Sequence, residues 1–186
     1  MKATDLLKSQ HQDIMEMFEK LQDGDTDDAS QRFDDLARAL VAHDAIEREI
    51  FYPLCEDVLG ETDELMGAVV EHRMIEFCLY VAMEALGKDD FGAKVGVLRK
   101  LVLEHLEDEE DALLPRIDGE LDEDHLEKVG EQMEEHYEQA ESSNAREALE
   151  DALTPLVGGL LKRAATPKGN GAAHRKPKRA RVRTAD

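Results

Sequence analysis

The chain has 186 residues and a net charge of −21, with 44 acidic against 23 basic side chains. This length accommodates one compact domain with additions. No apolar run approaches the roughly 18 residues that cross a bilayer, and no signal-peptide segment precedes the first predicted helix. We therefore expect a cytoplasmic protein without membrane contact. The two cysteines, Cys55 and Cys78, are too few for a disulfide framework, so we expect both to be reduced and packed in the core.

Leu, Ala, Glu and Asp dominate the composition, which favours an all-α fold. In chain order, we expect helices over about residues 4–24, 28–59, 62–87, 90–117, 122–141 and 145–162. Thr4 and Thr62 are placed to cap the first and third helices, and Gly60 and Gly87 mark the ends of the second and third. The short connections between the first four helices favour antiparallel neighbours, as in an up-down-up-down four-helix bundle.

The charge divides the chain into an acidic body and a basic end. Residues 163–186 carry eight basic side chains against Asp186 alone, whereas the preceding 162 residues hold 15 basic and 43 acidic ones. We expect the bundle over residues 1–118 and a C-terminal extension of one or two additional helices over residues 119–162. Residues 163–186 show no apolar period and are expected to form a disordered basic tail.

Three interpretations of the basic tail stay open. In the first, the tail is a solvated segment that folds back on the acidic body through an electrostatic attraction, which salt screens. In the second, the tail contacts the phosphate backbone of a nucleic acid without sequence preference, since it has no aromatic residues for base stacking. In the third, it contacts another acidic partner.

Histidines and glutamates occupy the apolar stripes of the first four helices. A residue at every third or fourth position of a helix faces the core. The stripe of the second helix runs through Phe33, Leu36, Leu40, His43, Glu47, Ile50 and Leu54, and that of the fourth through Phe91, Val95, Leu98, Val102, His105, Glu109 and Ala112. Each of the four helices has one stripe histidine, and three also have a glutamate one turn later. These residues are His11, His43, Glu47, His72, Glu76, His105 and Glu109.

Such a pattern is costly without a partner, because an uncompensated buried carboxylate or imidazole forfeits much of its hydration free energy. A pair of metal cations removes the problem by turning the buried groups into ligands. The alternative is a set of ordinary core histidines with satisfied hydrogen bonds. One histidine in each of four helices, three of them with a glutamate at the same spacing, favours a dinuclear metal site.

The second and fourth helices also share an internal repeat. His43, Glu47 and Pro53 have the same spacing as His105, Glu109 and Pro115. A proline late in a helix kinks or ends it, so both helices pair a ligand motif with a bend. Together with His11 and His72, this pattern resembles the hemerythrin HHE cation-binding family over roughly residues 1–140.

The resemblance implies a role for each of the candidate residues. His11 and His43 would bind one iron, His72 and His105 the other, and Glu47 and Glu109 would be the bridging carboxylates. Glu76 stands where oxygen-carrying hemerythrins typically have a further histidine. Their second bridge is usually an aspartate five residues after its histidine, whereas here Glu109 follows His105 by four residues and Glu110 by five. Both departures argue against reversible oxygen carriage and indicate the carboxylate-rich branch of the family.

Counting these ligands with one oxo or hydroxo bridge leaves one position open on two octahedral ions. Mixed imidazole and carboxylate ligands suit iron, with manganese as the alternative. Members of the family are linked to iron or oxygen sensing, peroxide breakdown and nitric oxide chemistry. We therefore expect a di-iron protein that binds or senses dioxygen, peroxide, nitric oxide or iron. The alternative is an enzyme with catalase-like peroxide breakdown, which needs the same ligands.

Several neighbours of the candidate ligands have open roles. Asp44, next to His43, is either an extra ligand or a hydrogen-bond partner outside the ligand set, and Glu110 poses the same question. For Tyr52 and Tyr80, packing is favoured over a hydroxyl contact with the site. His125 and His136 fall outside the ligand repeat and are expected at the surface.

Overall fold

The computed structural model describes residues 1–23 and 28–165, with side chains for residues 1–22 and 28–155, and no strand occurs in these ranges. Residues 1–155 form one compact unit and residues from Leu156 onward a second. The regular elements are α1 (Ala3–Asp23), α2 (Ala29–Ile46), the π-helical turn η2 (Glu47–Phe51), α3 (Tyr52–Leu59), α4 (Asp63–Met83), α5 (Phe91–Asp108), the π-helical turn η3 (Glu109–Leu113), α6 (Leu114–Glu120), α7 (Glu123–Glu141) and α8 (Ala145–Ala165).

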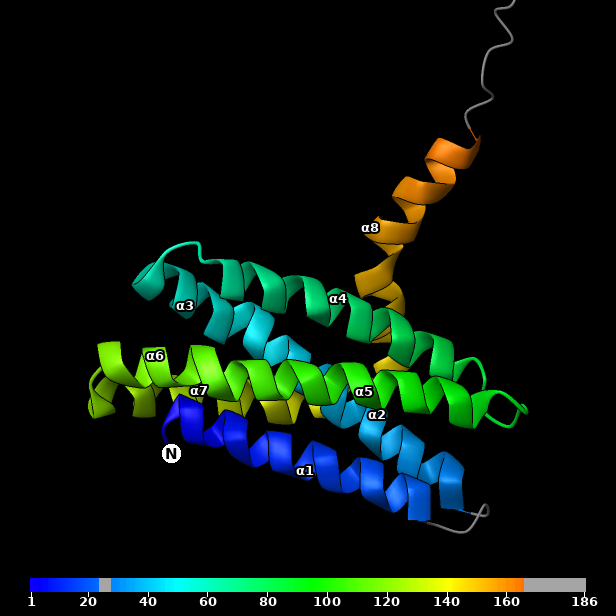
Figure 1. Ribbon diagram of the computed structural model, residues 1–186, viewed down its shortest axis with the longest axis horizontal. Coiled ribbons are helices and arrows are strands. Elements are labelled where there is room, and N and C mark those ends of the chain that lie inside the picture. Colours follow the sequence, from blue (N-terminus) through cyan, green and yellow to red (C-terminus); the bar gives the residue numbers. More distant parts are fainter. Residues whose placement is uncertain (24–27, 166–186) are drawn as a thin grey trace, which may run out of the picture. The chain divides into compact units, whose positions relative to one another are not determined.

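The arrangement is the expected up-down-up-down bundle (Figure 1). The predicted second helix is the continuous run of α2, η2 and α3, and the predicted fourth is the run of α5, η3 and α6. Helix α1 packs against α2, and α4 against α5, while α7 lies against both α1 and α2. The additional helices are thus confirmed, and the first of them covers one side of the bundle.

The helix ends follow most of the predicted signals. The Thr62 hydroxyl accepts a hydrogen bond from the Leu65 amide at 3.2 Å and caps α4. Gly60 and Gly87 adopt positive φ angles of 74° and 77°, a conformation that side-chain-bearing residues avoid. The expected cap at Thr4 is wrong, because α1 begins at Ala3 and the buried Thr4 hydroxyl donates to Asp118 at 2.7 Å.

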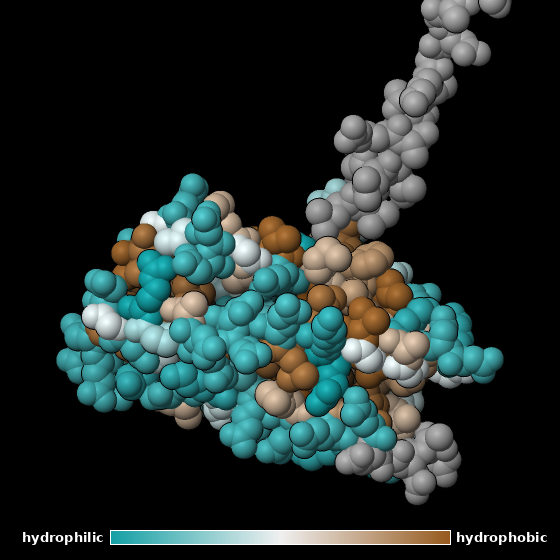
Figure 2. Space-filling model, viewed as in Figure 1, coloured by the Kyte–Doolittle hydropathy of each residue, from teal (hydrophilic) through white to brown (hydrophobic). Residues whose placement is uncertain are grey.

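The basic end is described only in part. Helix α8 continues to Ala165, past the predicted boundary at residue 162, so the first residues of the expected tail are helical. Residues 166–186, on which the expectation of disorder and the three interpretations of the tail rest, lie outside the described residues. No helix in the described ranges is long and apolar enough to cross a membrane. The face of the molecule that Figure 2 shows is largely hydrophilic.

Two separate apolar clusters fill the bundle, one toward each end. The first joins the start of α1 to α3, α6 and α7, and includes Leu7, Phe51, Cys55, Leu114, Ile117 and Met133. The second joins the other end of α1 to α2, α4 and α5, and includes Ile14, Phe18, Phe33, Leu36, Leu79 and Leu98. Along each of the four helical runs of the bundle, the candidate ligands lie close to the position in the sequence where one cluster ends and the other begins. Buried polar side chains therefore form a layer between two apolar ends.

Each π-helical turn begins at a candidate bridging glutamate and ends two residues before a proline. These are Glu47 with Pro53, and Glu109 with Pro115. A π-turn adds one residue to a helical turn, so the stripe after it moves by about one position. The expected core positions Ile50 and Leu54 are consequently half-buried, and Phe51, Tyr52 and Cys55 are buried in their place.

The same shift occurs in the second copy of the repeat. Ala112, expected on the core stripe, is half-buried, whereas Leu113, Leu114 and Ile117 are buried. Proline lacks the amide hydrogen and clashes with the carbonyl four residues earlier, which the wider turn accommodates. The bend predicted from the prolines is thus a change of helical register at the candidate ligands Glu47 and Glu109.

Candidate metal centre

Six of the seven predicted ligands converge at the middle of the bundle. They form two overlapping groups whose ligand atoms lie within 4.8 Å of one another. The first group is His11, His43, Glu47 and Glu109, and the second is Glu47, His72, His105 and Glu109. All six side chains are buried, and Glu47 is fully so. The histidines come from four different helices, while both shared glutamates begin π-helical turns.

The two shared carboxylates each lie between histidines of different groups. Glu47 Oε2 is 3.2 Å from His43 Nε2 and 3.0 Å from His72 Nε2. Glu109 Oε2 is 3.6 Å from His11 Nε2 and 3.7 Å from His105 Nε2. A carboxylate in this position can give one oxygen to each of two neighbouring cations. The two groups of candidate ligands therefore overlap at these two carboxylates.

Each histidine is oriented by a hydrogen bond at its other ring nitrogen. In each case Nδ1 contacts a side-chain oxygen from another helix. His11 contacts Glu110 at 2.9 Å and His43 contacts Gln10 at 3.0 Å. His72 contacts Asp44 at 2.7 Å and His105 contacts Glu71 at 2.9 Å. An imidazole that donates from Nδ1 to an acceptor keeps the Nε2 lone pair for a metal, and the acceptor fixes the ring. All four Nε2 atoms are therefore directed into the centre.

The unsatisfied atoms of the protein are concentrated in this centre. Among the described side chains, five of the six buried polar atoms without a hydrogen-bond partner belong to it. They are His11 Nε2, His43 Nε2, both carboxylate oxygens of Glu47 and Glu109 Oε2. Buried polar atoms are normally paired, and unpaired ones cost free energy of folding. These atoms are the ones a pair of cations would bind, so the residues fit the metal that the pattern predicts.

Burial and mutual repulsion shift the protonation of the metal-free centre. Burial, followed by the charge of Glu47, raises the pKa of Glu109 to about 8. Burial lowers the pKa of His72, but the hydrogen bond to Asp44 and the nearby charge of Glu47 outweigh it and raise the pKa to about 10. Burial, with the neighbouring histidines, holds the pKa of His43 well below its usual value. Without metal, protons on His72 and Glu109 thus reduce the repulsion.

Asp44 and Glu110 lie outside both ligand groups. Asp44 Oδ1 accepts from His72, and its other oxygen accepts from Arg48 at 2.8 Å. Although burial alone would raise the pKa of Asp44, the hydrogen bond to His72 and its charge lower it. Glu110 contacts His11, and its side chain is 42 % exposed. Of the roles considered for these two acids, the geometry places both as partners that orient a histidine.

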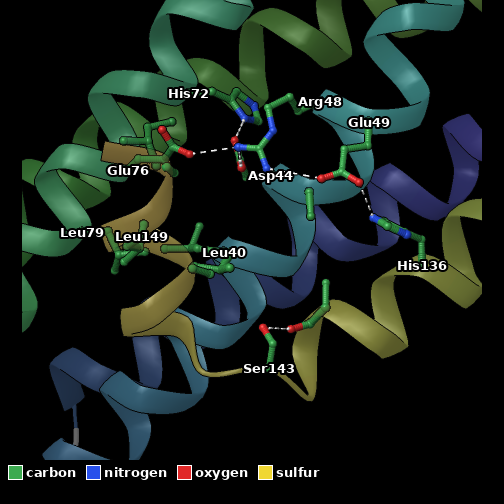
Figure 3. A pocket seen from close by; sticks show the side chains of 16 residues that line it. Leu40, Asp44, Arg48, Glu49, His72, Glu76, Leu79, His136, Ser143 and Leu149 are labelled. Atoms are coloured by element: carbon green, nitrogen blue, oxygen red, sulfur yellow. Dashed lines mark hydrogen bonds and ion pairs between the residues drawn. The ribbon is translucent and has the colours of Figure 1, made fainter. Parts of the chain in front are cut away.

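Glu76, the seventh predicted ligand, is buried but lies apart from both groups. Its carboxylate accepts from Arg73 at 2.8 Å and from Arg48 at 3.2 Å. Figure 3 shows it beside Arg48, Asp44 and His72 on the wall of a cavity. To ligate a cation, Glu76 would have to exchange these arginine contacts for the metal. Its role as a ligand stays a prediction.

The cavity beside Glu76 has a volume of about 220 Å³ and is bounded by α2, α4, α7 and α8. One end is polar, where His72 of the centre and its hydrogen-bond partner Asp44 line it. The remainder is mainly apolar, with Leu40, Leu79 and Leu149 on its wall (Figure 3). The helices that follow the bundle therefore complete a small apolar space against one edge of the metal centre.

Tyr52 belongs to the site, contrary to the expectation of a packing role. Its buried hydroxyl donates to Glu109 Oε1 at 2.8 Å and lies 2.7 Å from His72 Nε2. Burial, then the charges of Glu47 and Glu109, raise its pKa well above the usual value. The π-turn η2 brings Tyr52 to the core side of the helix. Regular α-helical periodicity does not place Tyr52 there, so the sequence pattern could not predict its contacts. Tyr80 has no such contact among the described residues.

Removing the Tyr52 hydroxyl should weaken metal binding. In Tyr52→Phe we expect about a ten- to hundredfold loss of affinity, the usual effect of losing an outer partner of a ligand. Competition with a chelator of known affinity measures the loss. Tyr80→Phe is the matched control and should bind like the wild type. Equal affinities for all three proteins would show that the hydroxyl only fills space.

The remaining expectations meet mixed outcomes. His125 is exposed, as expected, whereas His136 is only partly exposed and lies 3.0 Å from Glu49 at the edge of the apolar cavity. Both cysteines are free thiols. Cys55 is buried in the first apolar cluster, and burial raises its pKa, while Cys78 is partly buried against the second.

Fold and site together define an all-helical cation-binding protein with two overlapping ligand groups at the centre of its bundle. The family profile of the hemerythrin HHE cation binding domain matches residues 2–117. The chain belongs to this family, which confirms the resemblance found in the sequence.

A solved structure supports the same fold. It is that of a hemerythrin HHE cation binding domain-containing protein from Mycobacterium kansasii, with a TM-score of 0.70 and 22 % identity. The match covers 80 % of this chain and 97 % of that one. A comparison with curated proteins gave no significant match.

Proposed function

We propose that the protein is a non-haem di-iron protein that binds a small oxygen-derived ligand, dioxygen or nitric oxide, and reports its presence or the state of the iron. The observation that carries this proposal is the pair of ligand groups that share Glu47 and Glu109. Two shared carboxylates favour two cations at short separation over two independent sites. Four imidazoles with carboxylates suit iron, with manganese as the alternative.

In this proposal each part of the chain has a distinct task. His11 and His43 would hold one iron, and His72 and His105 the other, with Glu47 and Glu109 shared between them. Bound iron would supply a redox-active Lewis acid with room for a small ligand. The carboxylates and the amide at the four Nδ1 atoms keep the imidazoles oriented before metal arrives, which lowers the reorganisation needed on binding.

The apolar cavity supports a small neutral ligand. It borders the centre at His72, and its walls are mostly aliphatic. Dioxygen and nitric oxide are uncharged and partition into apolar space, whereas charged molecules would lose their hydration there. The ion pairs of Arg48 with Asp44 and Glu76 lie at the polar end of this space, beside His72 (Figure 3).

Reconstitution with ferrous iron under argon tests the proposal. We expect about two iron ions per chain, since two ligand groups are present, and a new electronic spectrum when nitric oxide is added to the reduced protein. Elemental analysis and absorbance spectroscopy measure the two effects. Iron content below half an ion per chain would contradict the proposed dinuclear centre. An unchanged spectrum would contradict the proposed binding of a small ligand.

Peroxide breakdown is a second candidate function, favoured by one observation. The Tyr52 hydroxyl lies within hydrogen-bond distance of both Glu109 and His72. A group that can give and take a proton beside the centre is what cleavage of an oxygen–oxygen bond requires. Oxygen evolution from hydrogen peroxide by the iron-loaded protein, lost in Tyr52→Phe protein of the same iron content, would favour this enzyme.

A further inference from the structure

A second cavity reaches the metal centre from a different side. It has a volume of about 430 Å³ and lies between the start of α4 and the end of α5 with η3. Its lining contains no basic residue and includes the acidic side chains of Asp63, Glu64, Glu71, Asp108, Glu109 and Asp111. We call it the acidic pocket. The other residues on its wall are mainly small, which keeps it open.

Glu109 connects the acidic pocket to the centre. This side chain is only 2 % exposed, yet it lines the pocket, and its Oε2 atom has no hydrogen-bond partner. The same atom lies between His11 and His105 of the two ligand groups. Glu109 therefore lines the pocket, while its unpaired buried oxygen lies among the candidate ligand histidines, so a cation that enters the pocket meets a side chain of the centre.

Glu71 adds a second link between the surface and the centre. Its side chain is 43 % exposed and lines the pocket, while its Oε2 atom holds His105 Nδ1 at 2.9 Å. The carboxylates that line the pocket therefore range from exposed ones, such as Asp63 and Asp111, through the half-buried Glu71 to the buried Glu109 of the centre. A partly dehydrated divalent cation would meet oxygen ligands along this route, which oxygen-preferring cations favour.

The charge of the pocket favours cations over other molecules. A cleft lined by one sign of charge focuses the electric field and raises the local concentration of the opposite ion. The apolar cavity on the His72 side lacks this property, because aliphatic side chains dominate it and Arg48 stands at its polar end. The acidic pocket therefore suits metal cations, and the apolar cavity suits small neutral ligands of the same centre.

We propose that the acidic pocket is the port through which divalent metal cations enter and leave the buried centre. This inference rests on the proposed dinuclear site and adds the route by which it is filled. It concerns the rate of loading, whereas the ligand set governs how much metal is held at equilibrium. The two can therefore be measured separately.

Removing charge from the port tests its electrostatic part. The triple variant Asp63→Asn, Glu64→Gln, Asp111→Asn leaves Glu71 and Glu109 in place. The control triple Glu127→Gln, Glu131→Gln, Glu134→Gln removes the same charge from exposed positions of α7. Apo protein is mixed with Co²⁺ in a stopped-flow instrument, and the visible absorption of bound cobalt is followed. We expect about tenfold slower loading in the port triple at low salt, a smaller difference at high salt, and little change in the control.

A change of size tests the route itself. A side chain at Gly67 would point into open space, with no atom within 4 Å of an added Cβ, and Gly67 lines the acidic pocket. Gly67→Phe should therefore narrow the port without altering charge or ligands. We expect loading, and release to a chelator, to slow by the same factor at every salt concentration, with unchanged final cobalt content. Gly96→Phe, at an equally open helical position outside the pocket, is the control.

The outcomes separate the port from the site. Wild-type protein that takes up no cobalt would overturn the proposed function itself. Wild-type protein that loads, while both port variants load as fast as their controls, would overturn the port alone. A Gly67→Phe protein that releases cobalt faster and holds less of it would show an effect on affinity, which would also overturn the port.

Discussion

Glu47→Gln and Glu109→Gln are each expected to reduce the metal content from about two ions per chain to less than one. The reason is that each carboxylate lies between histidines of both ligand groups, so its loss affects both cations. Glutamine keeps the shape of the side chain and creates no cavity, but the neutral amide cannot bridge two cations as a carboxylate does. Elemental analysis after reconstitution with ferrous iron measures the effect.

The same substitutions should act in the opposite direction on the metal-free protein. Glu47 and Glu109 are buried together, and their repulsion contributes to the raised pKa of Glu109. Above pH 8, where Glu109 has also lost its proton, replacing either residue by an amide removes one of two buried negative charges, so the apo variant should melt at a higher temperature than apo wild type. His125→Ala, at an exposed site away from the centre, should change neither quantity. If His125→Ala lowers the iron content as much as Glu47→Gln does, the assigned ligand set is wrong.

The stabilities of the apo and metal-loaded proteins should diverge as the pH rises from 6.5 to about 8. In the apo protein Glu109 has a pKa of about 8 and His72 of about 10, both above the usual values of 4.5 and 6.5. A group whose pKa is raised on folding stabilises the fold at low pH and loses that contribution as the pH rises through its folded value. Apo stability should therefore fall across this interval.

The lowered pKa values of His43 and His105 do not offset this trend, because they act below the usual histidine value of 6.5. Metal-loaded protein should behave differently. Cations compete with protons for the same ligands, so a higher pH favours metal binding, and metal that binds only the folded state stabilises it.

Calorimetric melting of both forms at pH 6.5 and pH 8 measures the difference, with chelator present in the apo samples. The gap between the two melting temperatures should be large and should widen with pH. Asp44→Asn should reduce the widening, since the hydrogen bond to Asp44 raises the pKa of His72. Equal melting temperatures with and without chelator would count against a buried metal site.

The sequence predicted the residues of the centre better than the contacts around them. The stripe positions of His11, His43, His72 and His105 follow from helical periodicity, because each precedes any irregularity in its helix. Beyond Glu47 and Glu109 the π-turns shift the register. This shift moved Tyr52 into the site and Ile50 away from the core stripe. The spacing of the prolines alone indicates a bend there, but it does not say which residues the bend turns toward the core.

Hydrogen-bond partners from distant helices were also beyond a reading of periodicity. Glu71 meets His105 across 34 residues, and Gln10 meets His43 across 33. Which acid of an acidic helix faces a given imidazole depends on the rotation and stagger of two packed helices. The stripe likewise placed Glu76 facing inward, which is correct, but Arg73 and Arg48 determine what it contacts there.

The layer of ligands between the two apolar clusters has a consequence for cooperativity. In most small domains a continuous apolar core makes folding all-or-none. Here the cluster around Phe51 and Ile117 and the cluster around Phe18 and Leu98 are separated by charged side chains in the metal-free state. With cations bound, coordination bonds from four helices would join the two ends. The metal would then set whether the bundle opens as one unit or as two halves with different rates of amide hydrogen exchange.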